Sequence, residues 1–287
     1  MKILLTGAQG QLGWELQRTV PAGVEVVALS SGELDITDCQ AVLRTVVAES
    51  PEVIINAAAY TAVDKAEQDV VRAFQVNGKG AAHLAQAARE RGTRLVHIST
   101  DFVFDGQKSS PYLPEDRPNP IGVYGRSKLA GEEQIMEITG GVATTIIRTA
   151  WVYSSHGHNF VKTMLRLMSE RDSLSVIADQ VGTPTWAHGL AGAVWGVVTK
   201  EVTGTHHWTD AGVASWYDFA VAIMEEAMAL GILAKQPNIR PIPASDYPLP
   251  AARPAYSVLD KGSLWQALGQ APSHWRVELR KMLHEVV

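Results

Sequence analysis

Short apolar runs alternate with longer stretches of mixed apolar and polar residues through about the first half of the chain. Five runs have the composition of buried strands, at residues 2–6, 24–29, 53–56, 95–99 and 142–148. The stretches between them, at 40–49, 70–91 and 127–137, are rich in Ala, Leu, Glu, Gln and Arg, which favour helices. This alternation predicts an α/β fold with a doubly wound parallel sheet, covered by crossover helices on both faces.

A glycine-rich turn follows the first run directly. Its spacing is Gly7-x-x-Gly10-x-x-Gly13, and a helical stretch begins beside it. Glycines let the backbone approach a pyrophosphate, and a helix start offers free N–H groups and the positive end of a dipole. The turn therefore predicts a dinucleotide-binding Rossmann sheet, although a glycine turn without a ligand would also fit. The cofactor contacts expected here are Gly7, Gly10, Gln11, Leu12 and Gly13.

The pattern loosens after Arg148. Helices are expected at 159–171, 190–199 and 216–230, and a strand at 174–178. Prolines that cluster between residues 237 and 254 mark an extended loop, which is either a surface connection or part of a substrate site. Residues 1–148 are expected to form the dinucleotide-binding domain, to which some later segments return. Residues 149–287 are expected to be mostly a smaller, mixed α/β substrate-binding region.

The composition is that of an ordinary globular protein, with 287 residues, 46% hydrophobic and 19% charged. The formal net charge of −5 gives no basic field for nucleic acid or an anionic membrane. Cys39 is the single cysteine, so no internal disulfide can form, and its acidic neighbours indicate that it is not a nucleophile. No apolar run approaches the ~20 residues of a membrane span. We expect a cytoplasmic protein with no nucleic-acid or membrane partner.

In an open parallel sheet, ligands bind beyond the carboxyl ends of the strands, so the residues after each run are candidate binding groups. Small residues after the third run allow a cofactor to lie against the backbone, or form a close helix–sheet contact. The cofactor contacts expected there are Ala57, Ala58, Ala59, Tyr60 and Thr61. After the fourth run, Ser99 is expected near the cofactor, and the Thr100 hydroxyl can bind a carbonyl oxygen or cap a turn. After the fifth, Trp151 fits either this opening or a domain interface.

The residues after the second run bear on the choice of cofactor. A carboxylate there would bind the ribose 2′-hydroxyl of the adenosine and repel a 2′-phosphate, but the chain has Ser30 and Ser31. No arginine adjoins these hydroxyls, so NADPH is favoured only modestly and NADH remains possible. Asp35 either binds the adenine amino group or caps a turn near Thr37, and Ile36 is expected beside the cofactor.

The segment Tyr124-Gly-Arg-Ser-Lys128 places a phenol and an ammonium one helical turn apart on the same face. A lysine cation beside a phenol favours the phenolate and moves its pKa from roughly 10 toward the neutral range. Such a pair can transfer a proton, and the Thr100 and Tyr124 hydroxyls can donate hydrogen bonds to a carbonyl oxygen that gains charge. Taken alone, Tyr-x-x-x-Lys also fits an amphipathic surface turn.

Taken in order, these motifs resemble those of the extended short-chain dehydrogenase/reductases, and most closely the dTDP-4-dehydrorhamnose reductase family. The similarity runs nearly end to end, through segments 10–16, 56–67, 99–104, 123–132, 159–164, 179–185 and 253–254. The blocks Ala-Val-Asp-Lys-Ala-Glu at 62–67 and Gln-Val-Gly-Thr-Pro-Thr at 180–185 are far more specific than the glycine turn.

The resemblance implies reduction of the C4 keto group of dTDP-4-dehydro-L-rhamnose to give dTDP-L-rhamnose, in nucleotide-sugar biosynthesis. Hydride would come from NADPH or NADH and the proton from Tyr124, while Lys128 would bind the nicotinamide ribose and tune the phenol. Thr100 would complete the triad, and Asn77 would support it. The residues implied to face the sugar are Thr100, Asp101, Phe102 and Trp151, with Phe102 at a position where tyrosine is frequent.

The diphosphate of a nucleotide sugar needs cationic or backbone donors. Lys162, Arg166 and Arg253 are the candidates. Arg253 is preferred because a guanidinium binds phosphate oxygens in a bidentate manner, although a structural salt bridge would explain it equally well.

Some members of the family are described as magnesium-dependent through acidic residues near a dimer contact. Glu15 and Glu285 correspond to two of these residues, and His188 stands where a third carboxylate is expected. Three scattered candidates of mixed type are more often surface charge than a magnesium site, so no metal ligand is assigned and Mg²⁺ remains open. A homodimer is possible.

Two alternatives remain open. The first is another nucleotide-sugar reductase, or an epimerase or dehydratase, of the same superfamily. Phe102 in place of a second acid argues against a dehydratase, and Ser30 in place of an acidic ribose ligand argues against an epimerase. The second is a non-catalytic, NADP-binding regulatory subunit, which would not need Thr100, Tyr124 and Lys128 together.

Overall fold

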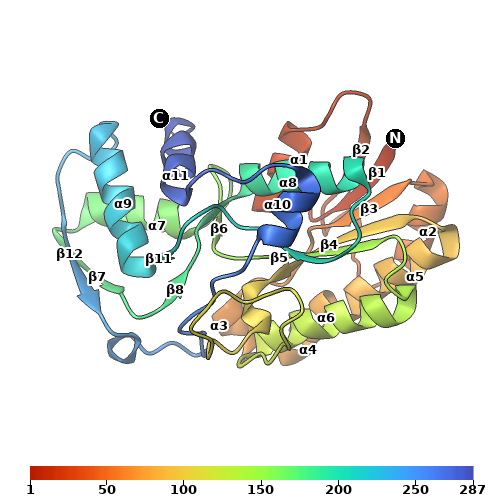
Figure 1. Cartoon of the computed structure of the whole chain (residues 1–287), viewed down its shortest axis with the longest axis horizontal. Helices are drawn as coiled ribbons and strands as arrows, with labels where there is room; N and C mark the ends of the chain where they lie inside the picture. Colours follow the sequence, from red (N-terminus) through yellow and green to blue (C-terminus); the bar gives the residue numbers. More distant parts are fainter. Residues whose placement is uncertain (287) are drawn as a thin grey trace.

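A six-stranded parallel sheet forms the centre of the molecule. The computed structural model describes residues 1–286, and the strand order across this sheet is β10-β5-β4-β3-β1-β2. Each neighbouring pair is parallel. Helices lie above and below the sheet (Figure 1). The predicted doubly wound α/β fold is confirmed.

Five of these strands coincide with the predicted apolar runs. They are β1 (Lys2–Thr6), β2 (Glu25–Leu29), β3 (Val53–Asn56), β4 (Arg94–Thr100) and β5 (Thr144–Thr149). The sixth strand, β10 (Gly204–His207), pairs with β5 and is absent from the prediction. Its sequence, Gly-Thr-His-His, has no apolar run, and His207 is its one buried residue.

Alternate side chains of the strands supply two separate cores. Ile3 and Leu5 pack with the helices α1 (Gln11–Arg18), α8 (Ala187–Lys200) and α10 (Gly262–Leu268). Leu4 points to the opposite face and packs with α2 (Cys39–Glu49), α5 (Ala81–Arg91) and α6 (Val123–Thr139). The period of two in a strand explains this division. The segments α8, β10 and α10 therefore return to the first half of the chain.

The stretch 70–91 is not one continuous helix. It consists of α4 (Val70–Phe74), the π-helical turn η1 (Gln75–Gly80) and α5. Gly131 of α6 lies so close to this turn that a Cβ on it would stand 2.2 Å from the Asn77 carbonyl oxygen. The side chain of Asn77 also binds backbone outside the helix. Such π-turns are frequent at functional sites.

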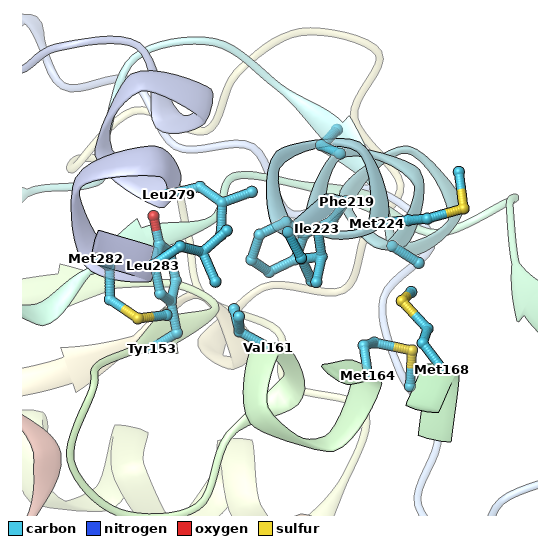
Figure 2. Packing of buried hydrophobic residues seen from close by; sticks show 14 of the residues in the cluster. Tyr153, Val161, Met164, Met168, Phe219, Ile223, Met224, Leu279, Met282 and Leu283 are labelled. Carbon is cyan, nitrogen blue, oxygen red and sulfur yellow. The ribbon is translucent and has the colours of Figure 1, made fainter. Parts of the chain in front are cut away.

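The remaining C-terminal elements pack around a third core. The helices α7 (Phe160–Glu170), α9 (Trp216–Ala229) and α11 (Trp275–His284) enclose it, and Figure 2 shows Val161, Phe219 and Leu283 turned toward its interior. The proline cluster is only partly a loop, because β12 (Asn238–Ile242) pairs in parallel with β7 (Ser173–Ile177). Pro241 is tolerated because this two-stranded sheet consists only of edge strands.

Short elements connect these units. They are α3 (Val63–Ala66), the 3₁₀ turns η2 (Asp101–Val103) and η3 (Ala244–Asp246), and the two-residue strands β6 (Val152–Tyr153), β8 (Val181–Gly182), β9 (Thr185–Trp186) and β11 (Ala214–Ser215). Among the helices within residues 1–286, none has the length and apolar character needed to traverse a bilayer.

Candidate active site

Two adjoining cavities lie at the carboxyl ends of the parallel strands. The larger, of about 650 Å³, is bordered by the end of β4, the start of α6 and the segment after β5. The smaller, of about 300 Å³, lies between the glycine turn and the end of β2. Gln9, Gly10, Ala57 and Ala59 line both, so the two cavities meet at the glycine turn.

The structure brings most of the expected site residues into these cavities. The larger is lined by Gly10, Gln11, Leu12, Ala57, Ala59, Thr61, Ser99, Thr100, Asp101, Phe102, Tyr124, Lys128, Trp151 and Arg253. The smaller is lined by Gly7, Gly10, Ser30, Asp35, Ile36, Ala57, Ala58, Ala59 and Tyr60. Gly13 and Asn77 are not among the lining residues and lie behind the walls.

The glycine turn is built by close backbone contacts. Gly7 has φ +77°, and a Cβ on it would lie 2.6 Å from the carbonyl carbon of Ala57. A Cβ on Gly13 would lie 2.1 Å from the carbonyl oxygen of Gly7, so Gly13 allows α1 to pack on the turn. No side chain caps the start of α1 at Gly10. Free N–H groups of this terminus suit a phosphate at the meeting point of the cavities.

The end of β2 carries a carboxylate that the sequence analysis missed. Glu33 Oε2 accepts hydrogen bonds from the Ser30 hydroxyl at 2.7 Å and from the Ser30 N–H at 2.8 Å. These bonds lower the pKa of Glu33. The negative charge of Glu33 is therefore held beside Ser30, the position at which an acidic ribose ligand is absent from the sequence.

Of the two roles expected for Asp35, the structure shows the cap of the turn at Thr37. Its Oδ1 accepts hydrogen bonds from the Thr37 N–H at 2.9 Å and the Thr37 hydroxyl at 2.8 Å, and both lower its pKa. Arg72 lines the same smaller cavity and lies 3.7 Å from Asp35 Oδ2. A cation is thus present near the adenosine end, but it comes from α4 rather than from the residues beside Ser30.

Asn77 connects two walls of the site without lining it. Its Oδ1 accepts from the Tyr60 N–H at 2.8 Å, and its Nδ2 donates to the Tyr60 carbonyl at 3.0 Å and the Ser127 hydroxyl at 2.9 Å. The segment after β3 is thereby held against α6, the helix that carries Tyr124 and Lys128.

Tyr124 and Thr100 stand together at the cavity wall. Desolvation of the Tyr124 phenol raises its pKa to about 12, although a hydrogen bond with the Thr100 side chain lowers it. The Thr100 hydroxyl also donates to Asp101 Oδ1 at 3.1 Å. The expected lowering of the phenol pKa by Lys128 is therefore wrong for this structure, because desolvation dominates and the Lys128 amino group bonds to the Ile98 carbonyl.

Lys128 directs its amino group to the strand β4. Nζ donates to the Ile98 carbonyl at 2.7 Å and lies 3.3 Å from His97 Nε2. Desolvation lowers the Lys128 pKa to about 8, and the charge of Glu132 opposes this shift. Lys128 thus titrates much closer to neutral pH than an exposed lysine.

A buried ion pair lies directly behind these groups. Arg148 and Glu132 bond at 2.6 Å, and the Ser99 hydroxyl donates to the same carboxylate. Ser99 lines the cavity, but its hydroxyl is committed to Glu132. The pair fixes α6 to β4 and β5, since its members come from α6 and β5 and Ser99 comes from β4.

Asp101 is buried next to Thr100. Desolvation raises its pKa from 3.8 to about 6. Hydrogen bonds from the Ser257 and Thr100 side chains oppose this shift. Asp101 is therefore a buried carboxyl that neighbouring hydroxyls hold at the wall of the larger cavity.

The aromatic residues form the far wall of the larger cavity. Trp151 stacks on Trp216 with a centroid separation of 3.5 Å, and it holds the unusual φ of +48°. Phe102 packs edge-on against Tyr124 at 5.5 Å. Both proposed roles of Trp151 are therefore compatible with the structure, because it lines the cavity and also packs on α9.

The three cationic residues considered for the diphosphate differ in their partners and in whether they line a cavity. Arg253 makes a bidentate pair with Asp64, with Nη1 at 3.0 Å and Nη2 at 2.7 Å, and still lines the larger cavity. The structural salt bridge is thus present. Lys162 donates to the Ser155 carbonyl, and Arg166 pairs with Glu170 on the surface of α7. Neither is among the residues lining the cavities.

The three residues considered for magnesium converge, but around an arginine. Arg18 Nη2 lies 2.7 Å from Glu285 Oε1 and 3.0 Å from Glu15 Oε2, and His188 Nδ1 lies 3.2 Å from the same Glu15 oxygen. A guanidinium already neutralises the carboxylates, so this cluster does not fit a hard dication. Within residues 1–286, no group of three or more His, Cys, Asp or Glu side chains is arranged to hold a metal ion.

Several functional neighbours have no local signal in the sequence. Trp216 and Gln9 reach the cavities from α9 and the glycine turn, and Glu33 reaches Ser30 by a turn. His97 is the exception, because a histidine in the middle of a buried apolar strand is itself unusual and could have been noticed.

Comparison with known proteins places this geometry in a family. The family model described as RmlD substrate binding domain matches residues 1–287. The chain belongs to the RmlD family. A dTDP-4-dehydrorhamnose reductase of Burkholderia thailandensis is 45% identical over 96% of each chain, and one of Aggregatibacter actinomycetemcomitans is 42% identical over 98% of each.

Solved structures agree with this membership of the RmlD family. A dTDP-4-dehydrorhamnose reductase of Clostridium acetobutylicum has a TM-score of 0.94, with 40% identity, over 100% of this chain and 99% of its own. The Bacillus anthracis reductase in complex with NADP has a TM-score of 0.93, with 36% identity, over 99% of both chains. The family therefore supports nicotinamide cofactor binding.

Proposed function

We propose that this RmlD-family protein reduces the C4 keto group of dTDP-4-dehydro-L-rhamnose to dTDP-L-rhamnose, with a nicotinamide cofactor. The observation that carries the proposal is the meeting of Thr100, Tyr124 and Lys128 in one cavity that continues into the glycine-lined groove. Full-length relatives that bear the reductase name support it.

The groove fits a dinucleotide. The uncapped start of α1 would offer free N–H groups to the pyrophosphate, and Gly7 and Gly10, which line the groove, would leave room for it. Ser30 and Ile36 would border the adenosine, and Lys128 the nicotinamide ribose. The bound nicotinamide supplies the hydride for the sugar carbon.

The protein residues supply the proton and position the carbonyl. With a pKa of about 12, Tyr124 is a neutral phenol at pH 7 and can donate its proton to the sugar oxygen as negative charge develops there. The Thr100 hydroxyl can turn from Asp101 Oδ1 to the same oxygen. A high phenol pKa is suited to this direction of reaction, since the acid must be protonated before transfer.

A third cavity, of about 560 Å³, adjoins the larger one through Trp216 and Arg253. Its walls are mostly apolar, with Phe160 and Met164 among them, and Arg171 at the margin. We place the nucleotide base of the substrate here. Arg253 then lies between base and sugar, where the diphosphate would pass.

Both coenzyme forms are proposed to bind. The hydroxyl of Ser30 and the cation of Arg72 favour the 2′-phosphate of NADPH, whereas the Glu33 carboxylate favours the free 2′-hydroxyl of NADH. The Glu33 charge is what makes the preference for NADPH weaker than hydroxyls alone would make it.

The direct test is Tyr124→Phe. We expect kcat to fall by roughly 10²–10⁴-fold, because the proton donor is lost, while NADPH still binds. NADPH oxidation with dTDP-4-dehydro-L-rhamnose is followed by absorbance, and cofactor binding by fluorescence titration. Tyr217→Phe, on α9 away from the cavity lining, is the matched control and should keep full activity.

The same assay separates the alternatives. Substrate isomerisation without net NADPH consumption would identify an epimerase. Unchanged turnover in Tyr124→Phe would contradict the proposed proton donor. Cofactor binding without any NADPH oxidation in the wild type would favour a regulatory subunit.

A further inference from the structure

Lys128 ends on a chain of buried polar groups that the proposed reaction does not use. Its Nζ lies 3.3 Å from His97 Nε2, and His97 Nδ1 lies 3.0 Å from Asn56 Nδ2. All three residues are 1% exposed. The chain runs from β3 through β4 to α6, across the middle of the sheet.

The orientation of the Asn56 amide is fixed by its other side. Oδ1 is 3.1 Å from the Ala58 N–H, which is a backbone group that can only donate. The Thr6 hydroxyl also donates to Oδ1, at 2.8 Å. Turning the amide over would set its NH₂ against the Ala58 N–H, so Nδ2 must be the atom that faces His97.

This orientation fixes the tautomer of His97. An amide NH₂ only donates, so His97 Nδ1 must accept and carries no proton. Burial and the charge of Lys128 hold the His97 pKa well below 6.5, so the ring is neutral. Its one proton is therefore on Nε2, the atom that faces Lys128.

We propose that Asn56 and His97 are positioning residues that present an imidazole N–H to Lys128 and thereby favour its neutral amine over the ammonium. An Nε2–H can donate only to a lone pair, which an amine has and an ammonium lacks. The amine still donates to the Ile98 carbonyl. Lys128 is thus set up to lose its proton nearer to neutral pH than burial alone would dictate.

Other titratable and charged groups also surround Lys128. Glu132 on α6 favours the ammonium, but it is paired with Arg148 on β5. Tyr124 on α6 and Asp101 in η2 line the same cavity and are titratable. These groups are unchanged in the variants below, so a change in the titration of Lys128 reports on its contact with His97 and Asn56.

The first experiment determines the tautomer of His97 by NMR and does not depend on enzymatic activity. Long-range ¹H–¹⁵N spectra of the ¹⁵N-histidine-labelled protein give the protonated nitrogen of each ring, and the His97 signals are those that His97→Gln removes. We expect the Nε2–H form throughout pH 6–8 in the wild type. In Asn56→Asp, the carboxylate accepts from Nδ1 and the tautomer should switch. An Nδ1–H ring in the wild type, or protonation of His97 near pH 6.5, overturns the proposal.

The second experiment reads Lys128 through the proposed reductase activity, on which this part rests. Loss of the Lys128 proton should give an alkaline limb in the pH profile of kcat/KM. In both His97→Gln and Asn56→Asp, the limb should move up by about one pH unit, a tenfold change in the protonation equilibrium. His206→Gln, on the edge strand β10, is the matched control and should leave it in place.

The two experiments fail separately. Absence of all turnover would contradict the proposed function, while the tautomer would still be measurable. If His97→Gln and Asn56→Asp are folded and active but their alkaline limb of kcat/KM stays in place, the proposed role of Asn56 and His97 is contradicted. The reductase proposal would still stand.

Discussion

At the scale of single residues, burial governs the titration of the site. Desolvation raises the pKa of Tyr124 to about 12 and of Asp101 to about 6, and lowers that of Lys128 to about 8. Each of the three is shifted toward its neutral form, as expected for groups removed from water. The site therefore holds a protonated phenol, a carboxyl that titrates near neutral pH and a lysine that can lose its charge.

Glu33→Gln should change the coenzyme preference. Removing the charge that Glu33 holds beside Ser30 should lower the Kd ratio of NADPH to NADH by roughly fivefold, because repulsion of the 2′-phosphate is lost. Titration calorimetry with both coenzymes measures this without turnover. Glu90→Gln removes an equal charge on the outer side of α5 and should leave the ratio unchanged. An equal ratio in Glu33→Gln and wild type would show that Glu33 has no influence on the choice.

Asp101 should make stability depend on pH. Its folded pKa of about 6 exceeds the unfolded 3.8, so the folded state binds more protons between these values. Its contribution is fully present below about pH 4 and is lost as pH rises through 6. Asp101→Asn should therefore be more stable than the wild type at pH 7, by up to about 3 kcal/mol, and nearly equal at pH 4. Urea unfolding at the two pH values measures the difference, and a constant difference would refute the assignment.

At the scale of elements, α6 organises the site. It carries Tyr124 and Lys128 toward the cavity and Glu132 toward Arg148. Two glycines let it approach its neighbours. A Cβ on Gly125 would lie 2.1 Å from the Phe102 carbonyl oxygen, and one on Gly131 would lie 2.2 Å from that of Asn77. The positions of Tyr124 and Lys128 therefore depend on close backbone contacts along one helix.

Gly131→Ala should be destabilising for this reason. The added methyl cannot fit against the Asn77 carbonyl, so η1 and α6 must separate, at a cost of about 1–3 kcal/mol. Gly192→Ala is the matched control within α8, because a Cβ there meets nothing within 4 Å. That change should stabilise the protein by about 0.5–1 kcal/mol, as alanine favours helix. Denaturant unfolding of both variants should show opposite signs, and equal signs would contradict the packing argument.

At the scale of the whole molecule, two packed regions are joined across the cavity. Arg253 from the C-terminal region pairs with Asp64 after β3, and residues of both regions line the larger cavity. The site is therefore formed by both regions together. The cluster of Glu15, Arg18 and Glu285 makes a second connection, between α1 and the residues that follow α11. The homodimer and the cytoplasmic location stay predictions.

Removal of divalent metal should have little effect on this molecule. Arg18 already occupies the position between Glu15 and Glu285, so no dication is needed to offset their charges. Activity and melting temperature should be the same after EDTA treatment and after addition of excess Mg²⁺. A loss of activity with EDTA that Mg²⁺ restores would contradict this role of Arg18.

The sequence by itself determined five of the six strands of the sheet, the glycine turn and the order of Thr100, Tyr124 and Lys128 along the chain. These features are local, because strand period and turn chemistry depend on residues close in sequence. Only the tertiary structure decided which groups meet. Arg18 lies between Glu15 and Glu285, Arg253 pairs with Asp64, and His97 faces Lys128. It also decided that desolvation, rather than a neighbouring lysine, sets the Tyr124 pKa, since burial depends on packing between distant segments.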